Sequence, residues 1–493
     1  KNEFLIAEGE SMMQIHILDI VIFVVFTLGT VLFGISFFRK NKNVSDYTEA
    51  GGSVPGFIVG MSIFATYVSS ISFLGLPGSA YAGNWNSFVF SLSIPIASII
   101  ASNYFVPFYR KISSVSAYSF LEERFGYWAR AYAAVCYLLT QVARIGSVLF
   151  LLALALHFML GWSISSIIII TGLCVVIYSV LGGIKAVIWT DAIQGLILIV
   201  GALVSAIVLL FSLPEGMSQF FAVGKEFDKF SLGSFNCEVN MPTFWVTLFY
   251  GLFINLQNYG IDQNYVQRYK SAKDEKNARF SALFGGLLYL PVSFLFFIIG
   301  TALFVYYKVQ AGLLPEYITG DQVFPYFIVN GLPVGVTGLL IAAIFSAGMS
   351  TISTSINSSA TIILTDFFEH GKKDISEKKK MVILYTMSFI LGLLGIGIGL
   401  AMMSVKSALD AWWGMASIFS GGMLGLFLLG YLSRKARSIH ALIGVVCGVV
   451  LIAWMTLSGQ TLFHHYLAIV FGTMLIFIVG FFVGRVATKK NDE

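Results

Sequence analysis

Long apolar runs alternate with short polar segments along almost the whole chain, and thirteen such runs can be marked. Most exceed the ~20 residues that an α-helix needs to cross the hydrocarbon core of a bilayer. A transmembrane β-barrel would instead show segments of about ten residues with alternating polarity. The pattern therefore predicts an all-α integral membrane protein with about 13 transmembrane helices. The runs cover residues 17–37, 54–81, 87–109, 127–160, 163–181, 189–213, 244–267, 279–307, 335–365, 380–404, 410–432, 439–457 and 463–484.

The amino-acid composition also indicates a protein that lies in a membrane. Of the 493 residues, 57% are hydrophobic and only 11% are charged, and the mean hydropathy is +0.84, whereas soluble domains carry about 25% charged residues. The net charge of +5 reflects basic loops and gives no reason to expect a nucleic acid partner. The four cysteines and six histidines show no spacing typical of a disulfide framework or a metal site.

Basic residues predict the orientation in the membrane. Clusters follow every odd-numbered run, at 39–42, 110–130, 185, 268–279, 372–380, 434–437 and 485–490. Because short cytoplasmic loops are rich in Lys and Arg, the N-terminus should lie outside and the tail at 486–493 in the cytoplasm. Residues 1–14 lack the basic and apolar regions of a signal peptide. We interpret them as an artificial leader or a short extracellular N-terminus.

Two of the runs are interrupted at matching positions. The second contains "IFATYVSSISFLGLPG" and the seventh contains "LFINLQNYGIDQNYVQR", and the two lie five runs apart. Transporters built from two inverted five-helix repeats place discontinuous helices at corresponding positions, where unwound backbone binds ions and substrate. The spacing predicts a LeuT-type 5+5 inverted-repeat fold in one transporter domain at 15–485. Its repeats would cover about 52–213 and 240–432.

The ninth run carries an unusual density of hydroxyl groups, "SAGMSTISTSINSSAT" at 346–361. Single Ser and Thr residues usually bond to carbonyls four residues earlier in a helix. Here Thr351, Thr354, Ser355 and Ser358 follow the spacing i, i+3, i+4, i+7 and so share one face. A stripe of neutral oxygens suits a small hard cation, for which sodium is the natural candidate. A proton, or simple helix packing, is the alternative.

Two charged residues lie within apolar runs. Arg144 is central in "LLTQVARIGSVLF", where insertion costs ~2.5–3.5 kcal/mol, so it should face a water-filled cavity or a partner. The alternative is a structural pairing with carbonyl groups or with Asp262. Asp191 in "VIWTDAIQG" is a functional candidate as an intramembrane carboxylate. It also lies near the start of its predicted helix, where a carboxylate stabilises the helix dipole.

The chain resembles the sodium:solute symporter family from about residue 15 to 485. This family includes sodium-coupled carriers of sugars, sialic acid, proline and iodide. The matching stretches are "DYTEAGGSVPGFIVGMSIFATYVSS", "SAYSFLEERFG", "YSVLGGIKAVIWTDAIQG", "VQRY" and "IAAIFSAGMSTISTSINSSATIILTDF". The resemblance implies a secondary active transporter rather than an enzyme.

The resemblance also implies two ion sites. In such proteins, one sodium is held by two carbonyls of the broken helix and by hydroxyls of the ninth helix. The corresponding positions are Ala65, Val68, Thr351, Thr354 and Ser355. Some members bind a second sodium, for which the match is Asp191 together with Thr351 and Thr354.

For the substrate, the resemblance to sialic acid carriers implies that Arg144 binds a carboxylate with both arms of its guanidinium group, a geometry for which Arg is suited. Further pocket positions are Tyr67, Ser69, Ser72, Ser91, Asn255 and Asn258. The sequence departs from the family pattern at several of them. Tyr67 is larger than its counterparts, Ser91 replaces an amide or acid, and Asn258 replaces an aromatic gate.

These observations predict a sodium-coupled symporter that imports a small hydrophilic solute by alternating access, with one or two sodium ions. The expected solute is an anionic sugar such as sialic acid, and a neutral sugar or another small solute is the alternative. A membrane enzyme would need a nucleophile and base at motif spacing, and a channel would leave the two broken helices unexplained. The protein is expected in the plasma (inner) membrane, without an obligate protein partner.

Overall fold

The computed structural model describes residues 15–40, 43–316, 318, 320–371, 375–404, 415–416, 418–419 and 422–492. Within these ranges the chain is helical and forms no strand, apart from an isolated bridge between Val54 and Ala272. The all-α prediction is confirmed. The predicted leader or extracellular N-terminus at 1–14 lies outside the described residues.

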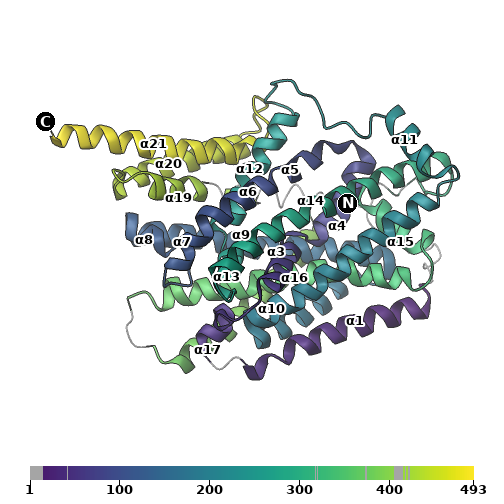
Figure 1. Ribbon diagram of the computed structural model, residues 1–493, viewed down its shortest axis with the longest axis horizontal. Coiled ribbons are helices and arrows are strands. Elements are labelled where there is room, and N and C mark those ends of the chain that lie inside the picture. Colours follow the sequence, from purple (N-terminus) through teal and green to yellow (C-terminus); the bar gives the residue numbers. More distant parts are fainter. Residues whose placement is uncertain are drawn as a thin grey trace.

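The helices pack into one elongated bundle, with α11 at one end and α19 to α21 towards the other (Figure 1). The first half of the chain forms α1 (Ile17–Ile35), α2 (Val44–Glu49), α3 (Gly56–Tyr67), α4 (Ser70–Ala82), α5 (Phe88–Leu92), α6 (Ile94–Ile100), α7 (Val106–Lys111), α8 (Ser119–Phe125), α9 (Tyr127–Leu160) and α10 (Ile164–Phe211). The second half forms α11 (Gly216–Glu226), α12 (Phe244–Ile261), α13 (Gln263–Ser271), α14 (Glu275–Val309), α15 (Val323–Gly331), α16 (Val336–Ile362), η6 (Ile363–Phe368), α17 (Glu377–Ala401), α19 (Met423–Leu432), α20 (Ser438–Leu457) and α21 (Leu467–Asp492).

Nine helices of the described chain are long and apolar enough to cross a membrane, and a tenth span results if α3 and α4 are counted as one bent pair. The predicted number differs mainly because the fifth and sixth runs form the single 48-residue helix α10. At 1.5 Å per residue this helix is about 70 Å long, twice the thickness of a hydrocarbon core. A kink at Gly183, where φ is 60°, divides it. The seventh run is split between α12 and α13, and the eleventh is described mainly as α19.

Both predicted helix breaks are present. Between α3 and α4 the backbone is extended at Val68 and Ser69, and the helix axis bends by 51°. Between α12 and α13 it is extended at Asp262, whose side chain caps α13 by accepting a hydrogen bond from the Asn264 N–H. The ninth run, in contrast, forms the continuous helix α16. Its hydroxyl groups therefore do not interrupt the backbone.

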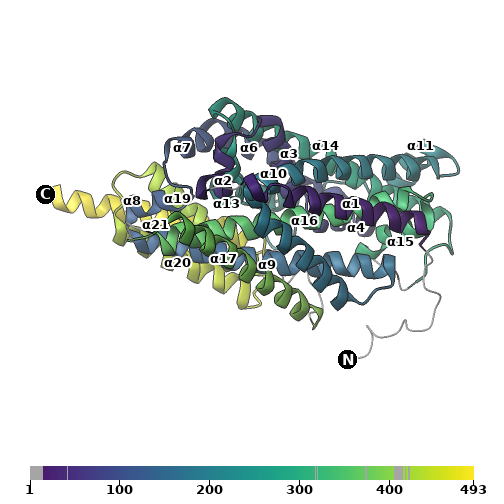
Figure 2. The same ribbon diagram turned by 90° about the horizontal axis from the view of Figure 1, so that it is seen from below.

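Helix α16 lies at the centre of the bundle, where α1, α3, α4, α9, α10 and α17 pack around it (Figure 2). In its most apolar window, 89% of the residues are buried. Glycine allows the neighbouring helices α3 and α14 to touch, because a Cβ atom at Gly285 would lie 2.8 Å from the carbonyl oxygen of Gly60. Such close backbone contact is typical of helix packing in membranes. Because six helices surround α16, its polar face is shielded from lipid.

Candidate functional site

The hydroxyl groups of α16 face the break between α3 and α4, as the sequence predicts. The Ser350 hydroxyl donates a 2.8 Å hydrogen bond to the Ala65 carbonyl. The hydroxyl oxygens of Thr354 and Thr66 are 3.5 Å apart, and all four residues are buried. Ser350 was not among the predicted ligands, although it lies in the same hydroxyl-rich stretch. Sequence spacing could have included it, because position 350 lies four residues before Thr354.

Two other predicted sodium ligands bond elsewhere in this structure. The Thr351 hydroxyl donates to the Ala347 carbonyl at 3.2 Å, the usual bond to the preceding turn. The Ser355 hydroxyl donates to the Gln141 Oε1 atom at 2.7 Å, which joins α16 to α9. Gln141 is an amide in a largely apolar run, three residues before Arg144, and this polarity is the signal that could have identified it. Val68 lies at the break itself, where it ends α3.

Asp191 forms a buried ion pair with Arg268. The Arg268 Nη2 atom lies 2.7 Å from Asp191 Oδ2, and both side chains have no exposed surface. The Ser62 hydroxyl also donates to Oδ2, at 2.8 Å, and the Thr354 hydroxyl lies 3.5 Å from it. The other carboxylate oxygen, Oδ1, is buried and has no hydrogen-bond partner among the described residues. The structure thus brings Asp191 and Thr354 together, as predicted, and adds an unexpected cation.

Two predictions about this pair are wrong. Arg268 and Lys270 were assigned to a cytoplasmic loop, but both are buried in α13, because the chain resumes a helix after the break at Asp262. Asp191 was also considered as a residue that stabilises a helix N-terminus. It lies inside α10, two turns beyond the kink at Gly183, and the dipole effect is confined to the first turn of a helix.

Arg144 projects from the middle of α9 towards the same break. Its Nη2 atom donates to the Thr66 carbonyl at 3.2 Å, and the described residues provide no other hydrogen bond for the guanidinium group. No acid of the described chain lies within ion-pairing distance of it, although its charge acts on Asp262 over a longer range. The predicted alternative of a carbonyl partner is therefore present in part. The remaining N–H groups stay available for a ligand.

Three of the predicted substrate positions, Tyr67, Asn255 and Asn258, lie together, and Tyr67 directly follows Thr66, whose carbonyl binds Arg144. The Tyr67 hydroxyl donates to Asn255 Oδ1, and Asn255 Nδ2 donates to the Ser93 hydroxyl at 2.9 Å. Asn258 lies next to the Tyr67 hydroxyl. The Tyr67 ring packs edge-on against Tyr289, with 4.7 Å between centroids. The break in α3–α4 and the end of α12 thus meet around one aromatic residue.

Two of the remaining serines, Ser72 and Ser91, lie beside Tyr289. Ser72 neighbours this tyrosine, and Ser69 is the residue before α4. Ser91 is only 1% exposed and its hydroxyl lies 2.7 Å from that of Ser293 on α14. Ser91 therefore faces a helix in this structure. Sequence analysis missed the tyrosines of this cluster, Tyr259, Tyr265 and Tyr289, because buried aromatic residues at helical spacing look like ordinary core.

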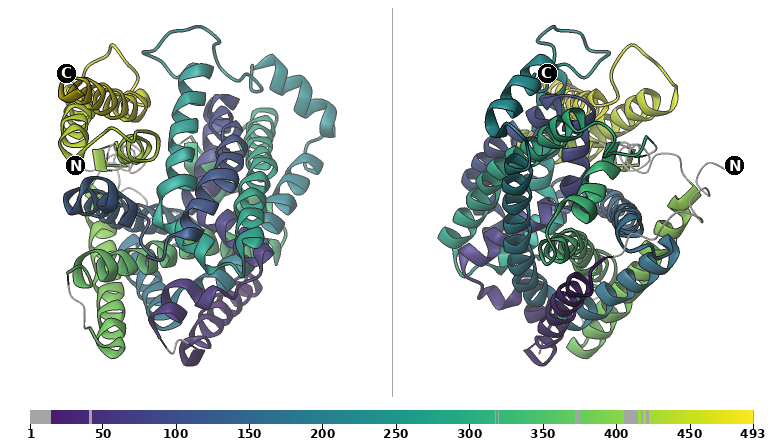
Figure 3. Two further views of the ribbon diagram at one scale, coloured as in Figure 1. Left: turned by 60° about the vertical axis from the view of Figure 1, so that its left-hand side comes forward. Right: turned by 90° about the vertical axis from the view of Figure 1, so that its right-hand side faces the viewer.

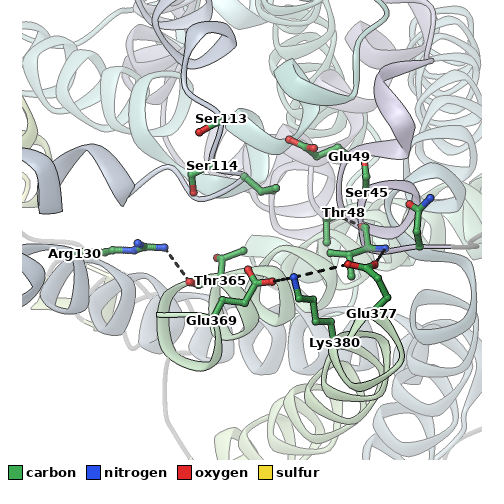
Figure 4. A pocket seen from close by; sticks show the side chains of 13 residues that line it. Ser45, Thr48, Glu49, Ser113, Ser114, Arg130, Thr365, Glu369, Glu377 and Lys380 are labelled. Atoms are coloured by element: carbon green, nitrogen blue, oxygen red, sulfur yellow. Dashed lines mark hydrogen bonds and ion pairs between the residues drawn. The ribbon is translucent and has the colours of Figure 1, made fainter. Parts of the chain in front are cut away.

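A polar cavity of about 460 Å³ lies between α2, the 113–115 loop, η6 and α17 (Figure 4). Lys380 lines this cavity, and its Nζ atom lies 2.7 Å from Glu369 Oε1. Burial raises the pKa of Glu49 on its wall, and nearby Lys270 opposes this shift. The cavity ends at Thr48, whose carbonyl accepts a 2.6 Å hydrogen bond from Gln267 Nε2.

Gln267 links α2, at the wall of this cavity, to α16. Its Nε2 atom also lies 2.9 Å from Asn357 Oδ1 and 3.3 Å from the Thr361 hydroxyl. Gln267 and Arg268 are both fully buried. Neighbouring residues of α13 therefore bond to Thr48 in the cavity wall and to Asp191.

The donor groups decide what this arrangement can bind. Carbonyl, hydroxyl and carboxylate oxygens meet between the α3–α4 break, α10 and α16, and oxygen ligands favour hard cations over soft metals. The unpartnered Asp191 Oδ1 atom is an additional acceptor for such an ion. Beside it, Arg144 offers donors suited to a carboxylate. The site can therefore hold a small cation and an organic anion on either side of residues 65–68.

The chain is similar to known proteins over most of its length. The model of the sodium:solute symporter family matches residues 47–448. The chain is 35% identical over 459 residues to the sodium/sialic acid symporter NanT of Aliivibrio fischeri, which covers 92% of this chain and 90% of that protein. It is 32% identical over 476 residues to the sodium/sialic acid symporter SiaT of Proteus mirabilis, with 95% of each chain covered.

Two solved structures are also similar. A substrate-bound, outward-open Na+-coupled sialic acid symporter has a TM-score of 0.91 and 30% sequence identity, and the match covers 95% of this chain and 97% of that one. The nucleobase-cation-symport-1 family transporter Mhp1 has a TM-score of 0.57 at 16% identity, with 91% and 96% covered. The second likeness concerns the fold alone.

Proposed function

Since the chain belongs to the sodium:solute symporter family, we propose that it couples the entry of sodium to the uptake of a sialic acid or a similar sugar acid. Transport follows alternating access, in which the site opens first to one side of the membrane and then to the other. A neutral sugar is the runner-up substrate.

The observation that carries the proposal is the setting of Arg144. Its guanidinium group reaches the α3–α4 break and donates one hydrogen bond to the Thr66 carbonyl. The remaining N–H groups can hold a substrate carboxylate through two parallel hydrogen bonds, which lysine cannot do. The polar neighbours Tyr67, Asn255 and Asn258 would then bind sugar hydroxyls.

Coupling is proposed to depend on the residues that the two ligands share. The Thr66 carbonyl accepts a hydrogen bond from Arg144, and the Thr66 hydroxyl lies beside the hydroxyl of Thr354. An ion at this break would therefore order the same backbone that positions the arginine. The first sodium is assigned to the group of residues predicted for it, Ala65, Val68, Thr351, Thr354 and Ser355.

The second sodium is assigned to Asp191 with Thr351 and Thr354. Its carboxylate is already bound to Arg268 through Oδ2, so the ion would use the free Oδ1 atom. A carboxylate can serve two cations in this way because its two oxygens offer about four lone-pair directions. Occupancy of this site would give two sodium ions for each substrate.

The proposed orientation places the N-terminus outside and the C-terminus in the cytoplasm, in the plasma (inner) membrane of the cell. The basic loops support this direction. The cavity beside Lys380 and Glu369 then lies on the cytoplasmic side. Opening of the Gln267 contacts would connect it with the ion site during release.

Uptake by reconstituted protein tests the proposal. Wild-type protein in liposomes should accumulate labelled N-acetylneuraminate when sodium is applied outside, and not when potassium replaces it. Loss of a charge-assisted bidentate contact costs roughly 1.5–3 kcal/mol, or about 10- to 150-fold in affinity. Arg144→Ala should therefore show this loss, and Arg144→Lys should also be impaired because it keeps the charge but not the fork.

The exposed residue Arg39 provides the control, because Arg39→Ala removes the same charge outside the site and should leave uptake unchanged. Sodium-driven uptake of a neutral hexose that survives Arg144→Ala would reject the sugar acid and favour the neutral-sugar symporter. In that case Arg144 would have only a structural role at the Thr66 carbonyl.

A further inference from the structure

Four cations meet at one corner of the molecule, where the loop between α19 and α20 lies against α21. Arg434, Lys435 and Arg437 are exposed, and the intervening Ala436 is buried. Gly484 of α21 packs directly on this residue, since a Cβ atom on it would lie 3.2 Å from Ala436 Cα. The contact brings the exposed Arg485 beside the loop. We name these four cations the basic corner.

Hydrogen bonds hold the loop in place. The Ser438 hydroxyl donates to the Phe125 carbonyl at 2.6 Å, and the Trp128 Nε1 atom donates to Ser438 at 2.7 Å. Arg124 Nε donates to the Gly430 carbonyl at 2.9 Å, at the end of α19. The basic corner is therefore presented on a fixed backbone, which lowers the entropy cost of binding a ligand.

Exposed apolar side chains surround the basic corner. They lie on the ends of the same three helices, which form a separate group beside the main bundle (Figure 3). The exposed fractions of these side chains run from 42% to 68%, and the set consists of Tyr431, Leu432, Ile439, Phe482 and Val486. Lipid tails cover such apolar surface in a membrane, and cations at its edge lie at the level of the headgroups.

The positive charge of the corner is not neutralised by the described parts of the chain. None of its four cations has an acidic group within 4.0 Å there, and Arg485 lies over the Phe481 ring at 4.9 Å. The neighbouring helix α8 carries Glu122, which is bound to Arg130 at 2.8 Å. It also carries the exposed Glu123, one negative charge against four positive ones.

We propose that the basic corner is a binding site for the phosphate headgroup of an anionic phospholipid. The cations supply the attraction, and the apolar rim fixes the depth of the lipid. Clusters of basic residues next to the cytoplasmic end of a membrane helix bind such lipids with a contribution from each cation. The site is independent of which solute the protein transports.

Native mass spectrometry of the full-length protein tests the site. Protein from nanodiscs of phosphatidylcholine with a minor share of phosphatidylglycerol should retain phosphatidylglycerol in excess of its share. In the variant R434Q/K435Q/R437Q/R485Q, the excess of retained phosphatidylglycerol over its share in the nanodisc should fall about tenfold. The triple variant R434Q/K435Q/R437Q should lie between the two, which shows that Arg485 contributes.

A matched control removes four other cations that are exposed and that lie on the same predicted side. It is R39Q/K111Q/K273Q/K276Q, and it should retain phosphatidylglycerol as the wild type does. Equal losses in both quadruple variants would overturn the site and leave only the general attraction of a basic face. Displacement of the lipid by excess inorganic phosphate would also overturn it, because a free-anion site needs no apolar rim. Elution volume and thermal unfolding of each variant verify that it is folded.

Discussion

The two broken helices have the same backbone feature but use it in opposite ways. At the α3–α4 break, the backbone accepts hydrogen bonds from other helices, namely from Ser350 to the Ala65 carbonyl and from Arg144 to the Thr66 carbonyl. At the α12–α13 break, side chains of the segment itself reach outward, and Gln267 and Arg268 bond to α2, α10 and α16.

This difference indicates a division of roles. At the first break, backbone oxygens accept hydrogen bonds from a hydroxyl and a guanidinium group, which a cation or a substrate can replace. The second break instead contributes side-chain donors, including the full positive charge of Arg268, which binds Asp191. The first break therefore has the features of a ligand-binding site, whereas the side chains of the second break connect α13 to α2, α10 and α16.

The largest effect is expected at the second break. Arg268→Ala would leave the buried Asp191 carboxylate without its cation, which costs about 3–5 kcal/mol of unfolding free energy. Thermal or denaturant unfolding in detergent measures the loss. Arg279→Ala is the control, because its pair with Glu275 is 42% and 46% exposed and such pairs contribute under about 1 kcal/mol. Equal stability of the two variants would contradict a structural role for the buried pair.

A smaller effect is expected at the first break. Thr354→Ala combined with Ser355→Ala removes two oxygens assigned to the first sodium, and each lost contact contributes roughly 1 kcal/mol. The sodium concentration for half-maximal uptake should rise roughly tenfold or more, while the amount of folded protein stays the same. Both residues are changed together because water can replace one missing oxygen. Sodium dependence like that of the wild type would remove these residues from the ion site.

The smallest effect, a change of one charge moved per substrate, is expected when both charges of the ion pair are removed together. Asp191→Asn alone would strand a buried arginine, so Asp191→Asn with Arg268→Gln is the better test of the second sodium. The wild type should move one net positive charge for each monoanionic substrate, with a sodium Hill slope above one. The double variant should move none, because only one sodium remains.

Electrogenic uptake is measured as current or as a voltage-dependent flux. An unaltered ratio of charge to substrate in the double variant would show that Asp191 is purely structural. A wild-type Hill slope of one would support the same conclusion. In either case the contrast between the two breaks would concern stability and not ion binding.

Much of the fold follows from local pattern. Apolar runs must become helices in a bilayer, because backbone groups find no water there and bond within their own segment. For the same reason, polar and Gly-rich interruptions such as those around Val68 and Asp262 are tolerated only where protein or a cavity surrounds them. The helix breaks could therefore be predicted from residues adjacent in the sequence. Helix number was less predictable, because the apolar pattern does not show that α10 continues through Gly183.

The sequence by itself determined that Asp191, Arg144 and the hydroxyl stripe of α16 lie within apolar membrane-spanning runs and need polar surroundings there. Only the tertiary structure decided which partners they have. Asp191 and Arg268 are 77 residues apart in the chain, and the bond between Ser350 and Ala65 spans 285 residues. The cost of burying a polar or charged group is a property of the residue and its segment, and so it is visible in the sequence. The identity of the group that offsets this cost depends on how distant helices pack, which local periodicity does not encode.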